Sequence, residues 1–137
     1  MDKQTINIGT VANDGTGDSL RDAMDKVNDN FTELYTVSVD AQATDDYTLV
    51  LADNLKLVTM DYVTACTLTV PPNTDVAFPV GALILVSQIG AGQVTFVEGA
   101  SVTINSMDSA LSLLGQYATA TLIQTAADEW LLTGAIE

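Results

Sequence analysis

The sequence predicts a mainly β protein, with a C-terminal β-sandwich or barrel domain preceded by an extended N-terminal arm and one short helix. From residue 47 onward, short runs of alternating apolar and polar residues are separated by Gly, Pro and Asn, as in strands joined by turns. Before that, apolar residues recur at helical spacing over residues 20–34. Hydrophobic residues make up 47% of the chain and charged residues 16%, which excludes a disordered chain.

Residues 1–17 are predicted to form the arm. Residues 5–9 alternate between polar and apolar types, which suits an extended segment or a short strand. Residues 13–17 read Asn-Asp-Gly-Thr-Gly and predict a turn, because the two glycines supply the positive φ angles that tight turns need.

Residues 18–36 are predicted to form the helix. Asp18 or Ser19 would cap its N-terminus, and Asp22 stands three residues after Ser19, as in a capping box. Asp22 and Lys26 are spaced for an ion pair on the outer face. The apolar stripe has the 4, 3, 4, 3 spacing of a coiled-coil seam and consists of Leu20, Met24, Val27, Phe31 and Leu34.

A helix this short is marginal in water by itself. Its stripe therefore needs a partner, which is either the β-domain of the same chain or identical copies of the helix. The stripe alone does not fix the number of copies, because Leu, Met, Val and Phe at seam positions are compatible with several.

Residues 37–46 are small, polar and acidic and predict a linker, and residues 47–137 predict the β-domain. Gly90-Ala91-Gly92 indicates a hairpin between two strands, and Ala127-Asp128 indicates a second one before Trp130. Pro71-Pro72 should end a strand, because proline donates no ladder hydrogen bond. The expected strands are 47–51, 56–59, 67–70, 83–89, 94–97, 102–104, 118–125 and 129–133.

The net charge of −14, with four basic residues and no histidine, restricts the partners of the chain. Nucleic acid and anionic membranes are excluded, since their recognition rests on Lys and Arg. Cys66 is the one cysteine and lies in an alternating run, so we expect it to be buried and reduced, consistent with assembly in a reducing cytoplasm. No signal peptide is recognised at the N-terminus. The β-domain is poor in charge, which suggests that subunits cover part of its surface.

The residue types also limit the chemistry. Without histidine neither a Ser-His-Asp nor a Cys-His arrangement can form, and one cysteine cannot hold zinc, so we expect no enzyme activity and no cofactor. Calcium at Asn13, Asp14, Asp18 and Asp22 is a weaker alternative to turn and cap roles for these residues. The candidate contacts for a glycan receptor are the aromatic residues Tyr62, Tyr117 and Trp130, although Trp130 lies in an alternating strand that favours burial.

The stretch from Ile8-Gly9 to Tyr35 resembles a segment near the N-termini of tailed-bacteriophage virion proteins, including tail fibres and accessory proteins. That segment reads N-D-G-T-G-D-x-L-R-x-A-x-x-K-x-N-x-N-F-x-E-L-Y. Met24 departs from it, since the family often has a larger apolar residue there. Residues 80–86, 90–96 and 130–134 resemble the β-domain that often ends such proteins.

The resemblance implies a homotrimeric virion protein whose helices form the trimer seam and whose arm docks on the virion through Ile6, Ile8 and Val11. It leaves the place in the particle open. The absence of a long shaft favours a capsid decoration or cement protein that binds the major capsid protein. A short tail or head fibre that contacts the host is the alternative, and a monomeric carbohydrate-binding module is a third interpretation.

Overall fold

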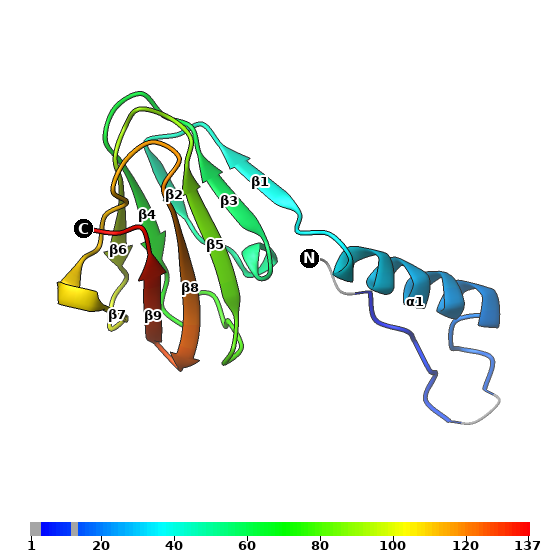
Figure 1. Ribbon diagram of the computed structural model, residues 1–137. Helices are drawn as coiled ribbons and strands as arrows, with labels where there is room; N and C mark the ends of the chain where they lie inside the picture. The colour runs from blue at the N-terminus through cyan, green and yellow to red at the C-terminus, as the bar shows by residue number, and fades with distance from the viewer. Residues whose placement is uncertain (1–3, 12–13) are drawn as a thin grey trace. The chain divides into compact units, whose positions relative to one another are not determined.

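The computed structural model describes residues 4–11 and 14–137 and confirms a mainly β protein. The chain forms two compact units, a helical unit that ends at Val37 and a β-unit that covers Ser38–Glu137 (Figure 1).

The helical unit contains the helix α1, Leu20–Leu34. Ser19 is its N-cap and its hydroxyl oxygen accepts a hydrogen bond from the Asp22 backbone N–H at 3.2 Å, which confirms one of the two predicted caps. The Ser19 hydroxyl also donates to the Asp22 carboxylate at 2.7 Å. None of the residues of α1 is buried. Within the described helical unit, the helix therefore gains little from apolar burial, although it is amphipathic.

The β-unit is wound as successive strands that alternate between two facing sheets (Figure 1). In one sheet, β1 (Val39–Gln42), β3 (Leu57–Met60) and β5 (Leu83–Gln88) are parallel neighbours. In the other, β2 (Asp46–Thr48), β4 (Cys66–Val70) and β6 (Val94–Glu98) are parallel neighbours. Each pair of consecutive strands, one from each sheet, makes one coil, so the chain winds through three coils.

The first sheet is then extended to six strands in the order β1-β3-β5-β8-β9-β7. Strands β8 (Thr119–Ala126) and β9 (Glu129–Gly134) form an antiparallel hairpin beside β5. Strand β7 (Thr103–Ser106) lies at the edge, parallel to β9. Two short 3-10 helices, η1 (Leu51–Asp53) and η2 (Met107–Ser109), complete the unit.

The predicted strand positions agree with the structure, but two predicted connections do not. Gly90-Ala91-Gly92 makes no hairpin: it joins β5 to β6, which lie in different sheets. The predicted linker 37–46 contains β1 and the start of β2. The last hairpin is confirmed, with Asp128 in its turn at φ 59°. Strand β4 ends at Val70, immediately before Pro71-Pro72, as expected.

The glycines at the β5–β6 connection have a packing reason. This corner lies directly on the corner between β3 and β4, and the Gly92 N–H donates to the Tyr62 carbonyl at 2.9 Å. A Cβ at Gly92 would lie 1.7 Å from the Thr64 carbonyl oxygen, and one at Gly90 would lie 2.1 Å from the Tyr62 carbonyl oxygen. The coils can stack this closely because no side chain separates the two backbones.

The core lies between the two sheets. Alternate residues of β3, β4, β5 and β6 point inward, as the buried positions of these strands show. Cys66 is buried among them, as predicted. Trp130 on β9 is fully buried and makes an edge-to-face contact with Phe78, with the ring centroids 5.3 Å apart.

Candidate functional site

The loop that precedes α1 is closed by the carboxylate of Asp14. Its Oδ2 accepts hydrogen bonds from the Thr10 N–H at 2.7 Å, the Thr10 hydroxyl at 2.7 Å and the Val11 N–H at 3.0 Å. Its Oδ1 accepts from the Thr16 N–H at 2.9 Å. The hydrogen bonds from Thr16 and Val11, followed by those from Thr10, hold the pKa of Asp14 well below its ordinary value. The acidic residue of the Asn-Asp-Gly-Thr-Gly turn is therefore a loop-forming residue.

A second set of bonds ties Asn7 of the arm to the start of the helix. The Asn7 N–H donates to the Asp18 carboxylate at 2.7 Å, and the Asp18 N–H donates back to the Asn7 carbonyl at 2.7 Å. Lys26 pairs with Asp18 at 2.6 Å and not with Asp22 as predicted. The Lys26 hydrogen bond, followed by that from Asn7, lowers the pKa of Asp18. Gly17 permits the close approach, since a Cβ there would lie 2.8 Å from the Asn7 carbonyl oxygen.

The part of the arm that precedes Asn7 runs beside α1. The Gln4 N–H donates to the Asn30 side chain at 2.8 Å, the Asn30 amide donates back to the Gln4 carbonyl at 2.9 Å, and Lys26 donates to the Thr5 carbonyl at 3.2 Å. The arm is thus bound to a flank of the helix, and residues 4–8 form no strand. Of the predicted docking residues, Ile6 is half-buried, whereas Ile8 is 89% exposed and Val11 is 68% exposed.

The arm leaves the predicted seam open. Phe31 is 56% exposed, Leu34 62% and Leu20 80%, while Met24 is also exposed and Val27 is half-buried. These five side chains share one stripe of α1, as their spacing predicts. Among the described residues of the helical unit, no segment covers the stripe, which leaves four of its five side chains exposed.

The three candidate receptor contacts do not form one site. Trp130 is fully buried, so it cannot stack on a sugar at the surface. It is a core residue, as its place in an alternating strand favoured. Tyr117 is 72% exposed at φ 67°, and Tyr62 is half-buried. The backbone of Tyr117 bonds to Gln88, and that of Tyr62 bonds to Gly92, so both lie at the end of the β-unit where β5 turns into β6.

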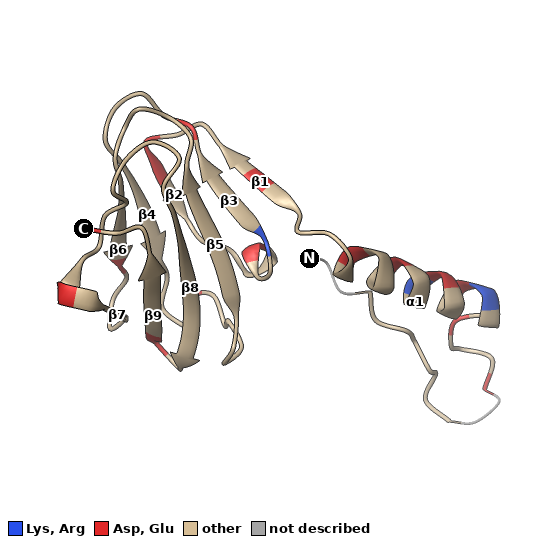
Figure 2. Ribbon diagram, viewed as in Figure 1, with Lys and Arg blue, Asp and Glu red and all other residues tan. Residues whose placement is uncertain are grey.

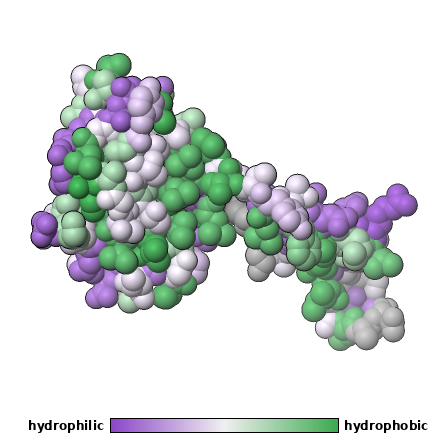
Figure 3. Space-filling view, in the orientation of Figure 1, coloured by the Kyte–Doolittle hydropathy of each residue, from purple (hydrophilic) through white to green (hydrophobic). Residues whose placement is uncertain are grey.

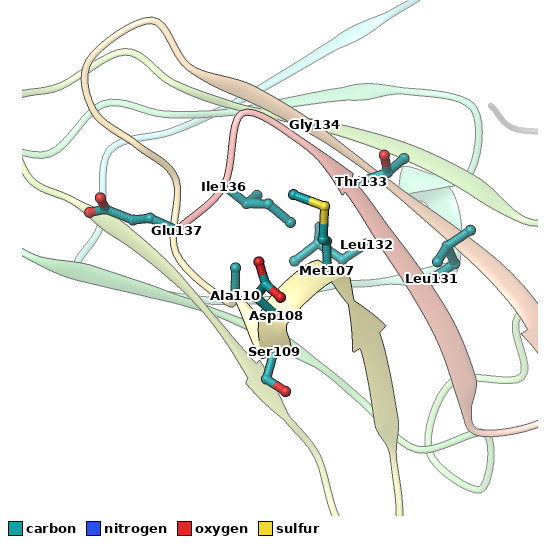
Figure 4. Close-up of a pocket in the computed structure, with 10 residues that line it drawn as sticks. All are labelled: Met107, Asp108, Ser109, Ala110, Leu131, Leu132, Thr133, Gly134, Ile136 and Glu137. Atoms are coloured by element: carbon teal, nitrogen blue, oxygen red, sulfur yellow. The ribbon is translucent and has the colours of Figure 1, made fainter.

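A pocket of about 540 Å³ lies between η2 and the end of β9 (Figure 4). The side chains of Met107, Leu132 and Ile136 point toward one another in it, and the carboxylates of Asp108 and Glu137 lie at its edge. None of its lining residues is Lys, Arg, His or Cys. This pocket could not be predicted from the sequence, because its lining residues come from two segments that contain no motif.

A buried polar network in the first coil was also missed. The Tyr47 hydroxyl lies 2.9 Å from Asp40 Oδ2 and 3.0 Å from Asp53 Oδ2, and Asp53 Oδ2 also accepts from the Val50 N–H at 2.8 Å. Asp53 is 1% exposed, and burial raises its pKa. Burial acts in the same direction on Asp40, but the hydrogen bonds from Tyr47 and Gln42 outweigh it and lower the Asp40 pKa. A phenol has one proton, so the Tyr47 hydroxyl can donate to one of the two carboxyl groups at a time.

Within residues 4–11 and 14–137, no group of three or more His, Cys, Asp or Glu side chains is arranged to hold a metal ion. The described part of the chain also contains no helix with the length and apolar character needed to cross a membrane. Charged side chains are unevenly distributed: carboxylates are spread over both units, and Lys56 is the single basic residue after residue 37 (Figure 2).

Comparison with known proteins defines the class of the chain. A family model of bacteriophage proteins matches residues 3–126, which covers both units through β8. The protein is thus a bacteriophage structural protein and is located in the virion. In particular, it belongs to the family described as Bacteriophage T4 gp9/10-like protein, N-terminal.

One relative adds detail. The chain is 64% identical over 33 residues to the baseplate wedge protein gp10 of Enterobacteria phage T4. This similarity covers 24% of the present chain and 6% of the relative, so the chain corresponds to a small part of that protein. The resemblance to phage virion proteins is confirmed at the level of the family.

Proposed function

We propose that the chain is a non-enzymatic structural component of the phage tail that assembles as a homotrimer through α1. The observation that carries this proposal is the unpartnered apolar seam of α1 in a chain related to a baseplate protein. The arm, bound along the helix, would present Ile8 and Val11 to a neighbouring virion protein.

The tail location is favoured over the head by the relative, whose printed name is that of a baseplate wedge protein. The length of the chain favoured capsid decoration, but no comparison supports that role. Binding to the major capsid protein is likewise a prediction without support from the comparisons. Labelling intact virions with gold-conjugated antibody against this chain tests the location. Label at the tail supports the proposal, whereas label spread over the head overturns it.

Self-association through α1 is supported by the energetics of the helix, and the number of three copies is taken from the resemblance to phage virion proteins. A helix of 15 residues without buried side chains is marginal alone. Burial of an apolar side chain contributes about 1.5–3 kcal/mol, so association of several copies through the five seam residues would supply the missing stabilisation. The bonds between arm and helix involve polar side chains at another flank of α1, so they leave the seam free for this contact.

The oligomer is tested with Phe31→Asp in the full chain, measured by light scattering coupled to size exclusion. We expect the wild type to have three times the mass of one chain and the variant to dissociate, because the substitution places a charge in the seam. Thr32→Asp is the matched control, since Thr32 is exposed on another face of α1 and should leave the trimer intact. A monomeric wild type, as expected of a carbohydrate-binding module, would overturn the proposal.

A further inference from the structure

Strand β1 gives the β-unit an open edge. It pairs with β3 on one side and is the first strand in the order of the six-stranded sheet. Asp40 and Gln42 are half-buried, whereas Val39 and Ala41 are exposed, and Val39 is 61% exposed. An unpaired edge strand with exposed apolar side chains is a template for association, and proteins usually protect such edges.

The turn around η1 adds apolar area to the same coil. Val50, Leu51 and Leu55 are exposed, and Leu51 is 52% exposed. The Tyr47 hydroxyl, between the carboxyls of Asp40 and Asp53, holds η1 against β1. We call Val39, Val50, Leu51 and Leu55 the first-coil surface. In the space-filling view, apolar side chains gather on the side of the β-unit where β1 and β3 run (Figure 3).

Charge limits where two copies of the β-unit can meet. Residues 38–137 contain eleven carboxylates and one lysine, so two copies repel one another over most of their surfaces. The first-coil surface contains no charged residue. The nearest carboxyls, Asp40 and Asp53, bond to Tyr47 inside the coil, and the one basic residue of the unit, Lys56, follows Leu55 directly.

The chain length between the units limits how far Val39 can lie from the end of α1. Four residues separate Leu34, the last residue of α1, from Val39, the first residue of β1. Covalent geometry limits the distance between Leu34 and Val39 to about 18 Å, whatever the orientation of the two units. In a trimer joined at the helix seams, each Val39 would therefore lie within about 18 Å of a seam residue of its own chain, which permits contact between neighbouring β1 edges.

We infer that the first-coil surface is a second contact between copies of this chain, in which the β1 edges and the turns around η1 of neighbouring β-units meet. This inference rests on the proposed homotrimer and extends its interface from the helix to the β-unit. A contact of this kind would explain why an acidic β-unit has an open edge strand and four exposed apolar residues on its first coil.

Single-cysteine substitutions in the full chain test the contact, with a short bismaleimide as the cross-linker. Native Cys66 is 2% exposed, so the wild type serves as the unreactive control. Leu34→Cys reports the end of the helix seam and Val39→Cys reports the first-coil surface. Val63→Cys is the matched control, because Val63 is 78% exposed and follows the other end of β3.

We expect both Leu34→Cys and Val39→Cys to give cross-linked chains in denaturing gels, with a yield at least several-fold above that of Val63→Cys. If Leu34→Cys is cross-linked but Val39→Cys matches Val63→Cys, the trimer stands and the inference is overturned. If neither is cross-linked and the mass is that of one chain, the proposed trimer fails and the inference fails with it. Cross-linking at Val39→Cys alone would support the contact while removing α1 as the seam.

Discussion

Gly92→Ala tests the stacked corner between coils. The substitution adds one methyl group, and that carbon would lie 1.7 Å from the Thr64 carbonyl oxygen and 2.2 Å from the Thr64 carbonyl carbon. Backbone atoms cannot rotate away as a flexible side chain can, so the two corners must separate. Overpacking of this kind costs about 1–3 kcal/mol. A hairpin turn in solvent, as the sequence alone suggested, would accept the same change at a much smaller cost.

Urea unfolding measures the effect, and the single tryptophan, Trp130, provides the signal because it is fully buried. With an m-value of about 2 kcal/mol/M, a loss of about 2 kcal/mol lowers the midpoint by about 1 M. Ala91→Ser is the control, since Ala91 is exposed in the same corner and should stay within about 0.5 kcal/mol of the wild type. A Gly92→Ala protein that unfolds at the wild-type midpoint would refute the stacked arrangement.

Two further predictions concern carboxyl groups. The pKa of Asp53 is raised in the folded state, so the folded protein holds the Asp53 proton more tightly than the unfolded chain does. The contribution of Asp53 to stability therefore declines as the pH rises above the ordinary aspartate pKa of 3.8. Asp53→Asn should remove this decline in pH-dependent urea titrations, whereas Asp75→Asn, at an exposed site, should keep it; equal slopes in both variants would contradict the assignment. Asp14 has a lowered pKa, so its stabilising effect is present above its ordinary value of 3.8 and is lost as the pH falls through the folded value. Asp14→Ala should speed hydrogen exchange at the Val11 and Thr16 amides at neutral pH, and unchanged exchange would show that another group closes the loop.

The positions of the strands could be predicted because alternation reports which residues face a core, and that period is local. The neighbours of each strand in the sheets could not be predicted, because a glycine-rich turn such as Gly90-Ala91-Gly92 suits a hairpin and a stacked corner equally well. The starts of β1, β3 and β5, at residues 39, 57 and 83, are also unevenly spaced, which hides the coils as a repeat.

In the helical unit, too, some features could be predicted from the sequence and others could not. The Ser19 cap and the α1 stripe follow from residue types at fixed spacing, and both are present. The contacts of the arm with the helix could not be predicted, because Lys26 and Asn30 are more than 20 positions away from their partners in sequence. Strand β1 was missed for a different reason: its inward residues are Asp40 and Gln42, whose burial depends on the Tyr47 hydroxyl and on the rest of the first coil.

The winding of the β-unit also sets an order in which it can form during synthesis. Each of β3, β4, β5 and β6 pairs with a strand that the ribosome has already released, so the three coils can be completed from the N-terminal side as the chain grows. Strand β7 is different, because its sheet neighbour β9 comes later in the chain, after β8. Translation that stops before Glu129 would leave β7 and β8 without their shared neighbour, exposing two strand edges at once.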